Sequence, residues 1–193
     1  EEALAALQRD GMPGPRSEPW KYTSLRDLAQ RRYQRAEPAA LEQALRERVL
    51  AIAAPRLVLV NGRFDAGLSA LSGLPEGARL RPLSAVLAED EGGSRDLAAL
   101  ARRFEGEDAL FPRVNAALAE DGCWLQLDAG VRVEGAVHIV HVSTAAEADV
   151  AWHLRSLIEL REDAQLAVCE HYLAANPHRH LGSSVLHVHL KQG

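Results

Sequence analysis

Apolar and polar residues alternate through the last third of the chain, and short polar turns interrupt the alternation at regular places. Leu127, Leu160 and Leu190 occupy equivalent positions just before three such turns, at spacings of 33 and 30 residues. Strand–turn–strand units that recur at such spacings are typical of stacked solenoid coils rather than of a closed sandwich. The pattern therefore predicts a β-solenoid from Cys123 onward.

The apolar strand positions are the candidates for the solenoid layers, and alternation assigns only some of them to the inside. They are Leu125, Leu127, Val131, Leu160, Leu166, Val168, Leu186 and Val188. The sequence stops as the third turn begins, and a solenoid needs a cap over its last layer. We therefore expect residues 123–193 to be the truncated start of a longer core, with an adhesive edge at 186–193 that a second copy would cover.

The first 122 residues show mainly helical spacing, with apolar side chains three or four positions apart. The expected helices cover residues 3–9, 20–35, 38–52, 94–104 and 108–122. A β segment near 56–84 interrupts them, because a β-branched run there leads into an Asn61-Gly62 turn. The predicted class is α+β, with a mainly helical region over 1–122 and a β region over 123–193.

Composition narrows the functional classes. Hydrophobic residues make up 47% of the chain, which is enough for a packed core. The net charge of −5 lacks the excess of basic residues that is typical of nucleic-acid binders. The start of the chain resembles a charged amphipathic helix rather than a secretion signal, and no apolar run approaches membrane-spanning length. We expect a cytoplasmic protein that binds neither nucleic acid nor membrane.

Two pairs of residues near the end of the chain are candidates for metal binding. Cys169 and His171 are two positions apart, as are His187 and His189, so each pair points to one face of its strand. If the coils stack in register, thiol and imidazoles would converge on iron or zinc. The alternative, which the lack of a CxxC or HExxH motif favours, is that these residues are inert on an exposed face. No metal, cofactor or catalytic residue is therefore assigned.

Acidic residues at the turns raise a second enzymatic possibility. Asp128, Glu159, Glu162 and Asp163 supply carboxylates, and a sugar-cleaving β-helix enzyme needs a pair of them. Acidic residues are also ordinary turn residues, which is the simpler interpretation. The sequence contains no GxxxxGK[ST] motif, so any ATP hydrolysis must come from a partner.

An aromatic segment near the start of the chain has two interpretations. Trp20, Lys21 and Tyr22 have the composition of a partner-binding patch, since exposed aromatic side chains anchor interfaces. The favoured interpretation is that Trp20 and Tyr22 pack the helical region onto the solenoid, because large aromatic side chains are seldom left exposed.

Four segments, taken in order, carry a resemblance to a known family. They are WKYTSL (20–25) preceded by 17–19, RLVLVNGRFDAGLS (56–69), NAALAEDG (115–122) and LREDAQLAVCEHYLA (160–174). Together they resemble the amino-terminal half of SufD-type members of the SufB/SufD family, which are subunits of the bacterial SUF iron–sulfur cluster assembly machinery. No single segment is diagnostic, but their order makes the combination specific.

The resemblance implies a right-handed parallel β-helix flanked by helical regions, and partnership with a SufB-like subunit and a SufC-like ABC-type ATPase. It implies that SufC docks on a carboxy-terminal helical segment, and that the cluster-related cysteine and histidine positions lie late in the β-helix. Both features lie beyond Gly193, so no catalytic residue is transferred.

The expected function is that of a non-enzymatic scaffold in iron acquisition or cluster formation, with iron or an iron–sulfur cluster held transiently in the full complex. The alternatives are a carbohydrate-active β-helix enzyme and a purely structural, homo-oligomeric β-solenoid. A homodimer is the alternative to the SufB-like and SufC-like partners.

Overall fold

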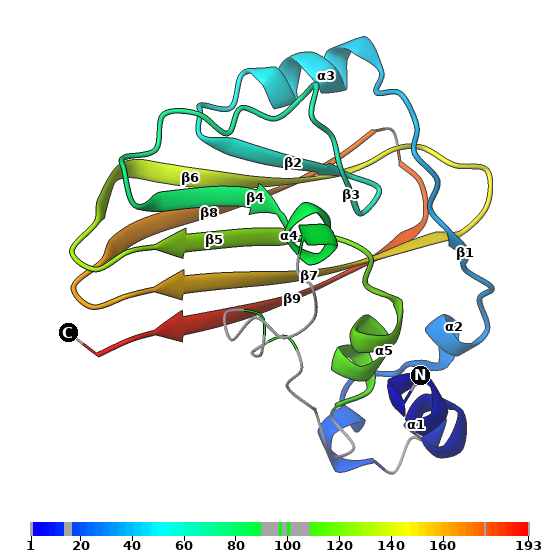
Figure 1. Cartoon of the computed structure of the whole chain (residues 1–193). Helices are drawn as coiled ribbons and strands as arrows, with labels where there is room; N and C mark the ends of the chain where they lie inside the picture. Colours follow the sequence, from blue (N-terminus) through cyan, green and yellow to red (C-terminus); the bar gives the residue numbers. More distant parts are fainter. Residues whose placement is uncertain are drawn as a thin grey trace.

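A computed structural model describes residues 2–13, 17–89, 97, 100, 109–175 and 177–192. Most of the chain folds into two β-sheets that face each other (Figure 1). Sheet A contains β1 (Gln34–Arg35), β4 (Ala78–Pro82), β5 (Cys123–Leu127), β7 (Val150–Leu160) and β9 (His180–Leu190). Sheet B contains β2 (Arg56–Val60), β3 (Arg63–Phe64), β6 (Arg132–Ser143) and β8 (Gln165–Ala174).

Parallel pairing dominates both sheets. In sheet A, β7 lies between β5 and β9 and is parallel to both. In sheet B, β6 lies between β2 and β8 and is again parallel to both. Leu127 pairs with Leu160 and Leu160 with Leu190, so the alignment of these three leucines from their spacing is confirmed.

The expected fold class is wrong, because two mixed sheets replace the first coils of a right-handed parallel β-helix. The described residues form no closed solenoid, and each sheet contains an antiparallel pair, β4 with β5 and β3 with β2. A regular spacing predicts which strands stack in parallel. It does not reveal that strands of 10 to 12 residues run in two opposed layers, or that earlier segments add antiparallel partners.

The front of the chain is less helical than its spacing predicts. The structure contains α1 (Glu2–Asp10), a 3₁₀ turn η1 (Glu18–Trp20), α2 (Arg26–Ala29), α3 (Gln43–Leu50), α4 (Leu83–Glu89) and α5 (Leu110–Leu118). The expected helix over 20–35 is not one element, because α2 ends at Ala29 and Gln34–Arg35 form β1, which pairs with β7. The expected helix over 94–104 lies outside the described residues, apart from 97 and 100.

The helices cover the sheets at separate places. Helix α1 packs on α5, which lies against β7 and β9, while α4 lies over β4, β5 and β7 (Figure 1). Among the described residues, no helix combines the length and apolarity needed to cross a membrane. Because β2 and β4 precede residue 122 and join the same sheets as the later strands, a domain division near Gly122 stays a prediction.

The main core lies between the sheets, and a second core lies beneath α3. Leu57 and Ile139 of sheet B meet Leu125 and Leu154 of sheet A in the main core. Val49 of α3 contributes to the second core, on the outer side of β2 and β6. Apolar side chains therefore pack against both faces of sheet B, and the side chains of β6 and β8 divide between these two faces.

Two polar residues join the strands at their ends. Asn61 and Gly62 adopt positive φ angles of 49° and 80° in the turn between β2 and β3, so the predicted tight turn is confirmed. Asp121 is buried, and its carboxylate accepts hydrogen bonds from the backbone N–H groups of Phe64, Ser84 and Gly122. One carboxylate thus ties β3, α4 and β5 together.

Candidate functional site

Strands β6 and β8 carry two groups of closely spaced ionisable side chains, one on each face of sheet B. In their parallel register, His138 lies beside Cys169 and His141 lies beside Tyr172. Alternate residues of a strand point to opposite faces. His138, Cys169 and His171 therefore share the outer face of sheet B, whereas His141, Glu170 and Tyr172 share the face toward sheet A.

The outer cluster consists of His138, Cys169 and His171. His138 Nδ1 and His171 Nε2 are 2.9 Å apart, and the ligand atoms of all three residues lie within 4.8 Å of one another. All three side chains are partly buried. Burial lowers the pKa of His138, and the neighbouring His171 lowers it further, which favours the neutral imidazole. Two imidazoles and a thiol form a borderline-soft ligand set suited to transition metals.

The inner cluster is centred on His141, which is only 1% exposed. Its ring stacks between Trp152 and Tyr172, with centroid distances of 6.0 and 4.6 Å, and its Nε2 lies 3.1 Å from Glu170 Oε1. Burial lowers the pKa of His141, although Glu170 opposes this effect. Burial and then Glu170 raise the pKa of Tyr172. This cluster is a hydrogen-bonded stack that begins at the buried His141 and ends at the exposed Glu170 and Tyr172.

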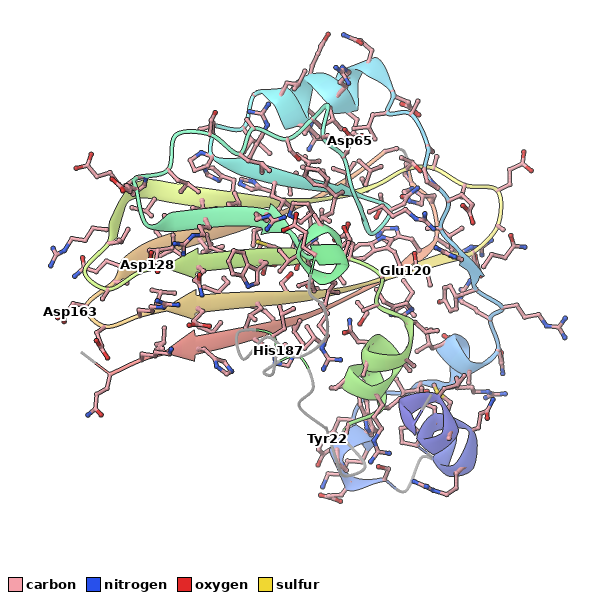
Figure 2. The ribbon with its side chains drawn as sticks, viewed as in Figure 1. Tyr22, Asp65, Glu120, Asp128, Asp163 and His187 are labelled. Carbon is pink, nitrogen blue, oxygen red and sulfur yellow. The ribbon has the colours of Figure 1, made fainter. Side chains whose placement is uncertain are left out.

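Of the four residues considered as metal ligands, the structure brings only Cys169 and His171 together. His187 and His189 lie on β9 in sheet A, while Cys169 and His171 lie on β8 in sheet B (Figure 2 labels His187). From β5 onward, successive strands alternate between the two sheets, so equivalent residues of β8 and β9 lie on opposite outer faces. The convergence of all four residues is therefore not observed.

His187 and His189 have different neighbours from the outer cluster. His187 is buried, and its Nε2 accepts a hydrogen bond of 3.0 Å from Arg155 Nε. His189 is exposed and pairs in register with Glu159 of β7. A guanidinium cation beside His187 disfavours a metal cation there.

Sequence reasoning missed His138, although a signal for it exists. His138 and His171 are separated by the same 33 residues that align Leu127 with Leu160. The register of β6 and β8 shifts between Arg132 and Ala136 by two residues, near Gly135 with its φ of 78°. A shift of two preserves the face of every side chain, so His138 still meets His171.

Two of the four acidic candidates, Asp128 and Glu159, form ion pairs with basic side chains. Asp128 pairs with Arg79 at 2.9 Å and with Arg161 at 3.4 Å, and Glu159 pairs with Lys191 at 3.4 Å (Figure 2 labels Asp128). The hydrogen bond from Arg79 lowers the pKa of Asp128. A glycosidase needs a carboxylic acid with a raised pKa, so this arrangement does not favour the carbohydrate-active alternative.

The aromatic segment is split between the two interpretations. The Trp20 ring packs edge-on against Phe111 of α5, at a centroid distance of 5.3 Å, so it anchors one helical element to another. Tyr22 is 90% exposed, and Lys21 Nζ lies 5.0 Å from its ring centroid. Tyr22 therefore does not pack the front of the chain onto the sheets (Figure 2).

The comparison with known families agrees with the order of these elements. The family described as the SufBD protein N-terminal region matches residues 1–139, which run from α1 into β6. The chain belongs to the SufBD family. The SufBD match includes His138 and ends before Cys169 and His171.

Two curated relatives support the same assignment. The iron–sulfur cluster assembly protein SufD of Escherichia coli is 26% identical over 182 residues, which cover 93% of this chain and 40% of the relative. An iron–sulfur cluster assembly SufBD family protein of Synechocystis is 23% identical over 163 residues, or 83% of this chain and 35% of the relative. The SufBD chain thus spans less than half the length of each relative.

Proposed function

We propose that this chain forms part of an iron–sulfur cluster assembly scaffold that works with a SufB-like subunit and a SufC-like ATPase. The match of residues 1–139 to the SufBD family supports this proposal most strongly. The two relatives are themselves named for iron–sulfur cluster assembly. The role is non-enzymatic, and it contributes to iron acquisition or cluster formation, with iron or the nascent cluster as cargo.

The two-sheet body is suited to the role of a platform. Leucine, isoleucine and valine side chains from both sheets are fully buried in one continuous core, and close packing of this kind transmits displacement rather than absorbing it. The 193 residues contain no P-loop, so the energy comes from the partner ATPase. When the partner ATPase binds or hydrolyses ATP, it would favour a different arrangement of its contacts with this chain.

The chemistry of the described side chains is consistent with a scaffold in the cytoplasm. Cys123 and Cys169 are free thiols, as expected of a reducing compartment. Asp128 and Glu159 are neutralised by arginine and lysine partners, which leaves them poorly suited to acid–base catalysis.

A genetic and biochemical experiment tests the proposal. The gene that carries this sequence is tagged in its own organism, and the tagged product is purified under mild conditions. We expect SufB-like and SufC-like proteins to be retained in defined ratios. Deletion of the gene should lower the activity of iron–sulfur enzymes, and the intact gene should restore that activity. Retention of neither partner, together with unchanged enzyme activities after deletion, would contradict the proposal.

A further inference from the structure

The outer face of β6 and β8 holds three side chains whose ligand atoms converge. His138, Cys169 and His171 form the group of metal-ligating residues that meets this spacing within the described ranges. We propose that these three residues bind one divalent transition-metal ion, with Zn²⁺ preferred. This inference does not rest on the proposed scaffold function, because it depends only on the ligand set and its geometry.

The distances already resemble those of a coordination sphere. Bonds of about 2.0 Å to nitrogen and 2.3 Å to sulfur place tetrahedral ligand atoms about 3.3–3.6 Å apart. His138 Nδ1 and His171 Nε2 lie 2.9 Å apart, and no ligand atom of the group is more than 4.8 Å from another. Binding would require the two imidazole nitrogens to move slightly apart and the most distant ligand atoms of the group to move closer together.

The backbone supports this geometry on rigid elements. His138 and Cys169 are direct neighbours in the parallel ladder, and His171 follows two residues along β8 on the same face. Ligands presented by paired strands are positioned more accurately than ligands presented by loops. Val140 and Leu173, farther along the same face of β6 and β8, belong to the apolar cluster beneath α3, which limits the movement of the strands.

The ligand set selects a class of metal. A thiolate and two imidazoles suit zinc and other late first-row divalent ions, whereas magnesium and calcium prefer oxygen ligands. Three protein ligands leave one coordination position open to water or to a further ligand, as at catalytic and transfer sites rather than closed structural ones. The partial burial of all three side chains leaves this fourth position accessible.

The hydrogen bond between the two imidazoles also favours a cation. Two imidazole nitrogens 2.9 Å apart share one proton, and the repulsion of two imidazolium groups would open the contact. When a metal ion binds both facing nitrogens, the proton of the donor ring moves to that ring's other nitrogen, so both rings stay neutral, and the Cys169 thiol releases its proton to solvent. In the described part of the chain, the other close histidine pair is His178 and His180, with centroids 4.8 Å apart, and it belongs to no three-ligand group.

Cobalt provides the direct test, because thiolate coordination gives Co²⁺ an intense charge-transfer absorption. The reduced, chelator-treated chain is titrated with Co²⁺. We expect saturation at one equivalent with a thiolate-to-cobalt band, displacement by Zn²⁺, and no displacement by Mg²⁺. Burial raises the pKa of the Cys123 thiol far above its ordinary value, so this core cysteine does not produce the band.

Matched variants decide the assignment. Cys169→Ser should abolish the charge-transfer band, and His171→Gln should weaken Co²⁺ binding at least about 10-fold, as even the loss of a supporting residue does at metal sites. His189→Gln, which alters an exposed histidine of β9, should change neither property. Circular dichroism would confirm that each variant is folded. A folded parent without a thiolate band, or a band that persists in Cys169→Ser, would overturn the proposal.

Discussion

Two three-residue segments of this chain look alike in sequence and differ in the structure. Cys169-Glu170-His171 lies on β8, and His187-Val188-His189 lies on β9. In each, the two outer residues point away from the interior, and the middle residue points toward the opposite sheet. Beside β8, strand β6 supplies His138, and three potential ligands converge. Beside β9, strand β7 supplies Arg155 and Glu159, and His187 becomes a hydrogen-bond acceptor.

The comparison shows that spacing within a strand sets which side chains share a face, while the neighbouring strand sets what they do there. An imidazole beside another imidazole and a thiol can bind a metal. An imidazole whose ring nitrogen accepts a hydrogen bond from a guanidinium group is already occupied. The residues that separate these two outcomes lie about thirty positions away in the sequence, so the local motif alone does not contain them.

The largest effect is expected from adding a methyl group at Gly122, where the chain enters β5 beside β7. A Cβ added at Gly122 would lie 1.9 Å from the carbonyl oxygen of Arg155, so Gly122→Ala must separate the strands that position Arg155. We expect a loss of about 3 kcal/mol in the free energy of unfolding, measured with urea. Gly67→Ala is the control, because its nearest contact is the Asp65 side chain at 3.4 Å. Similar losses for both variants would contradict this packing.

The next largest effect is a difference in the stability lost when His187 and His171 are replaced. His187→Ala removes the acceptor for Arg155 Nε, and Arg155 is itself buried. A buried donor that loses its acceptor costs about 1–3 kcal/mol. His171→Ala, at a partly buried position, should cost less than about 1 kcal/mol. Urea denaturation of the two variants measures the difference, and equal losses would show that the two environments do not differ as described.

We expect the β9 edge to drive self-association and the segment around Glu170 on β8 not to do so. Val188 and Leu190 are 51% and 71% exposed at the open edge formed by β9, whereas Glu170 is held by His141. We expect a second copy of this 193-residue chain to cover the β9 edge. Val188→Asp should weaken that association about tenfold, or about 1.4 kcal/mol. Sedimentation equilibrium tests this, with Glu170→Gln as the control. A parent that stays monomeric at high concentration would contradict it.

A smaller effect concerns the pH dependence of stability. Burial lowers the folded-state pKa of His141 below its ordinary 6.5, so the unfolded chain takes up the proton first. Stability is therefore complete above about pH 6.5 and falls as the pH drops toward the folded-state pKa. His141→Phe keeps a ring between Trp152 and Tyr172 and removes this titration. Below pH 6.5, the slope of stability against pH should decrease by less than about 1.4 kcal/mol per unit.

Urea titrations of the parent and His141→Phe at several pH values would measure this slope. Glu170 and Tyr172 face the same ring, and Glu170→Gln shows whether the carboxylate charge contributes, while Tyr172→Phe tests the phenol hydroxyl, which is uncharged in this range. An unchanged slope in His141→Phe would assign the acid sensitivity to the other histidines whose pKa is lowered, His138, His153 and His180.

The sequence predicted which of the later strands are neighbours, but it did not predict their division between two facing sheets. The spacing of Leu127, Leu160 and Leu190 correctly predicted three neighbouring strands, because each occupies the same place before a turn. The two sheets also include β2 and β4, whose pairing with β6 and β5 leaves no periodic pattern in the sequence.

The candidate site could be predicted in part for a related reason. Cys169 and His171 share a face by simple alternation, and this followed from the sequence. His138 joined them only through the parallel register of β6 and β8, which is offset by an irregularity near Gly135. The separation of His187 from the cluster followed from the alternation of consecutive strands between sheets, which the expected solenoid did not include.

Strand β8 presents Cys169 to His138 of β6 and not to the histidines of β9. Register neighbours on adjacent strands lie about 4.8 Å apart, within the range that a disulfide spans. His138→Cys should therefore form a disulfide with Cys169 on mild oxidation, identified by mass spectrometry of the digested chain. His189→Cys should leave Cys169 as a free thiol. A disulfide from position 189 to Cys169, with none from position 138, would show that β8 does not lie beside β6 in this register.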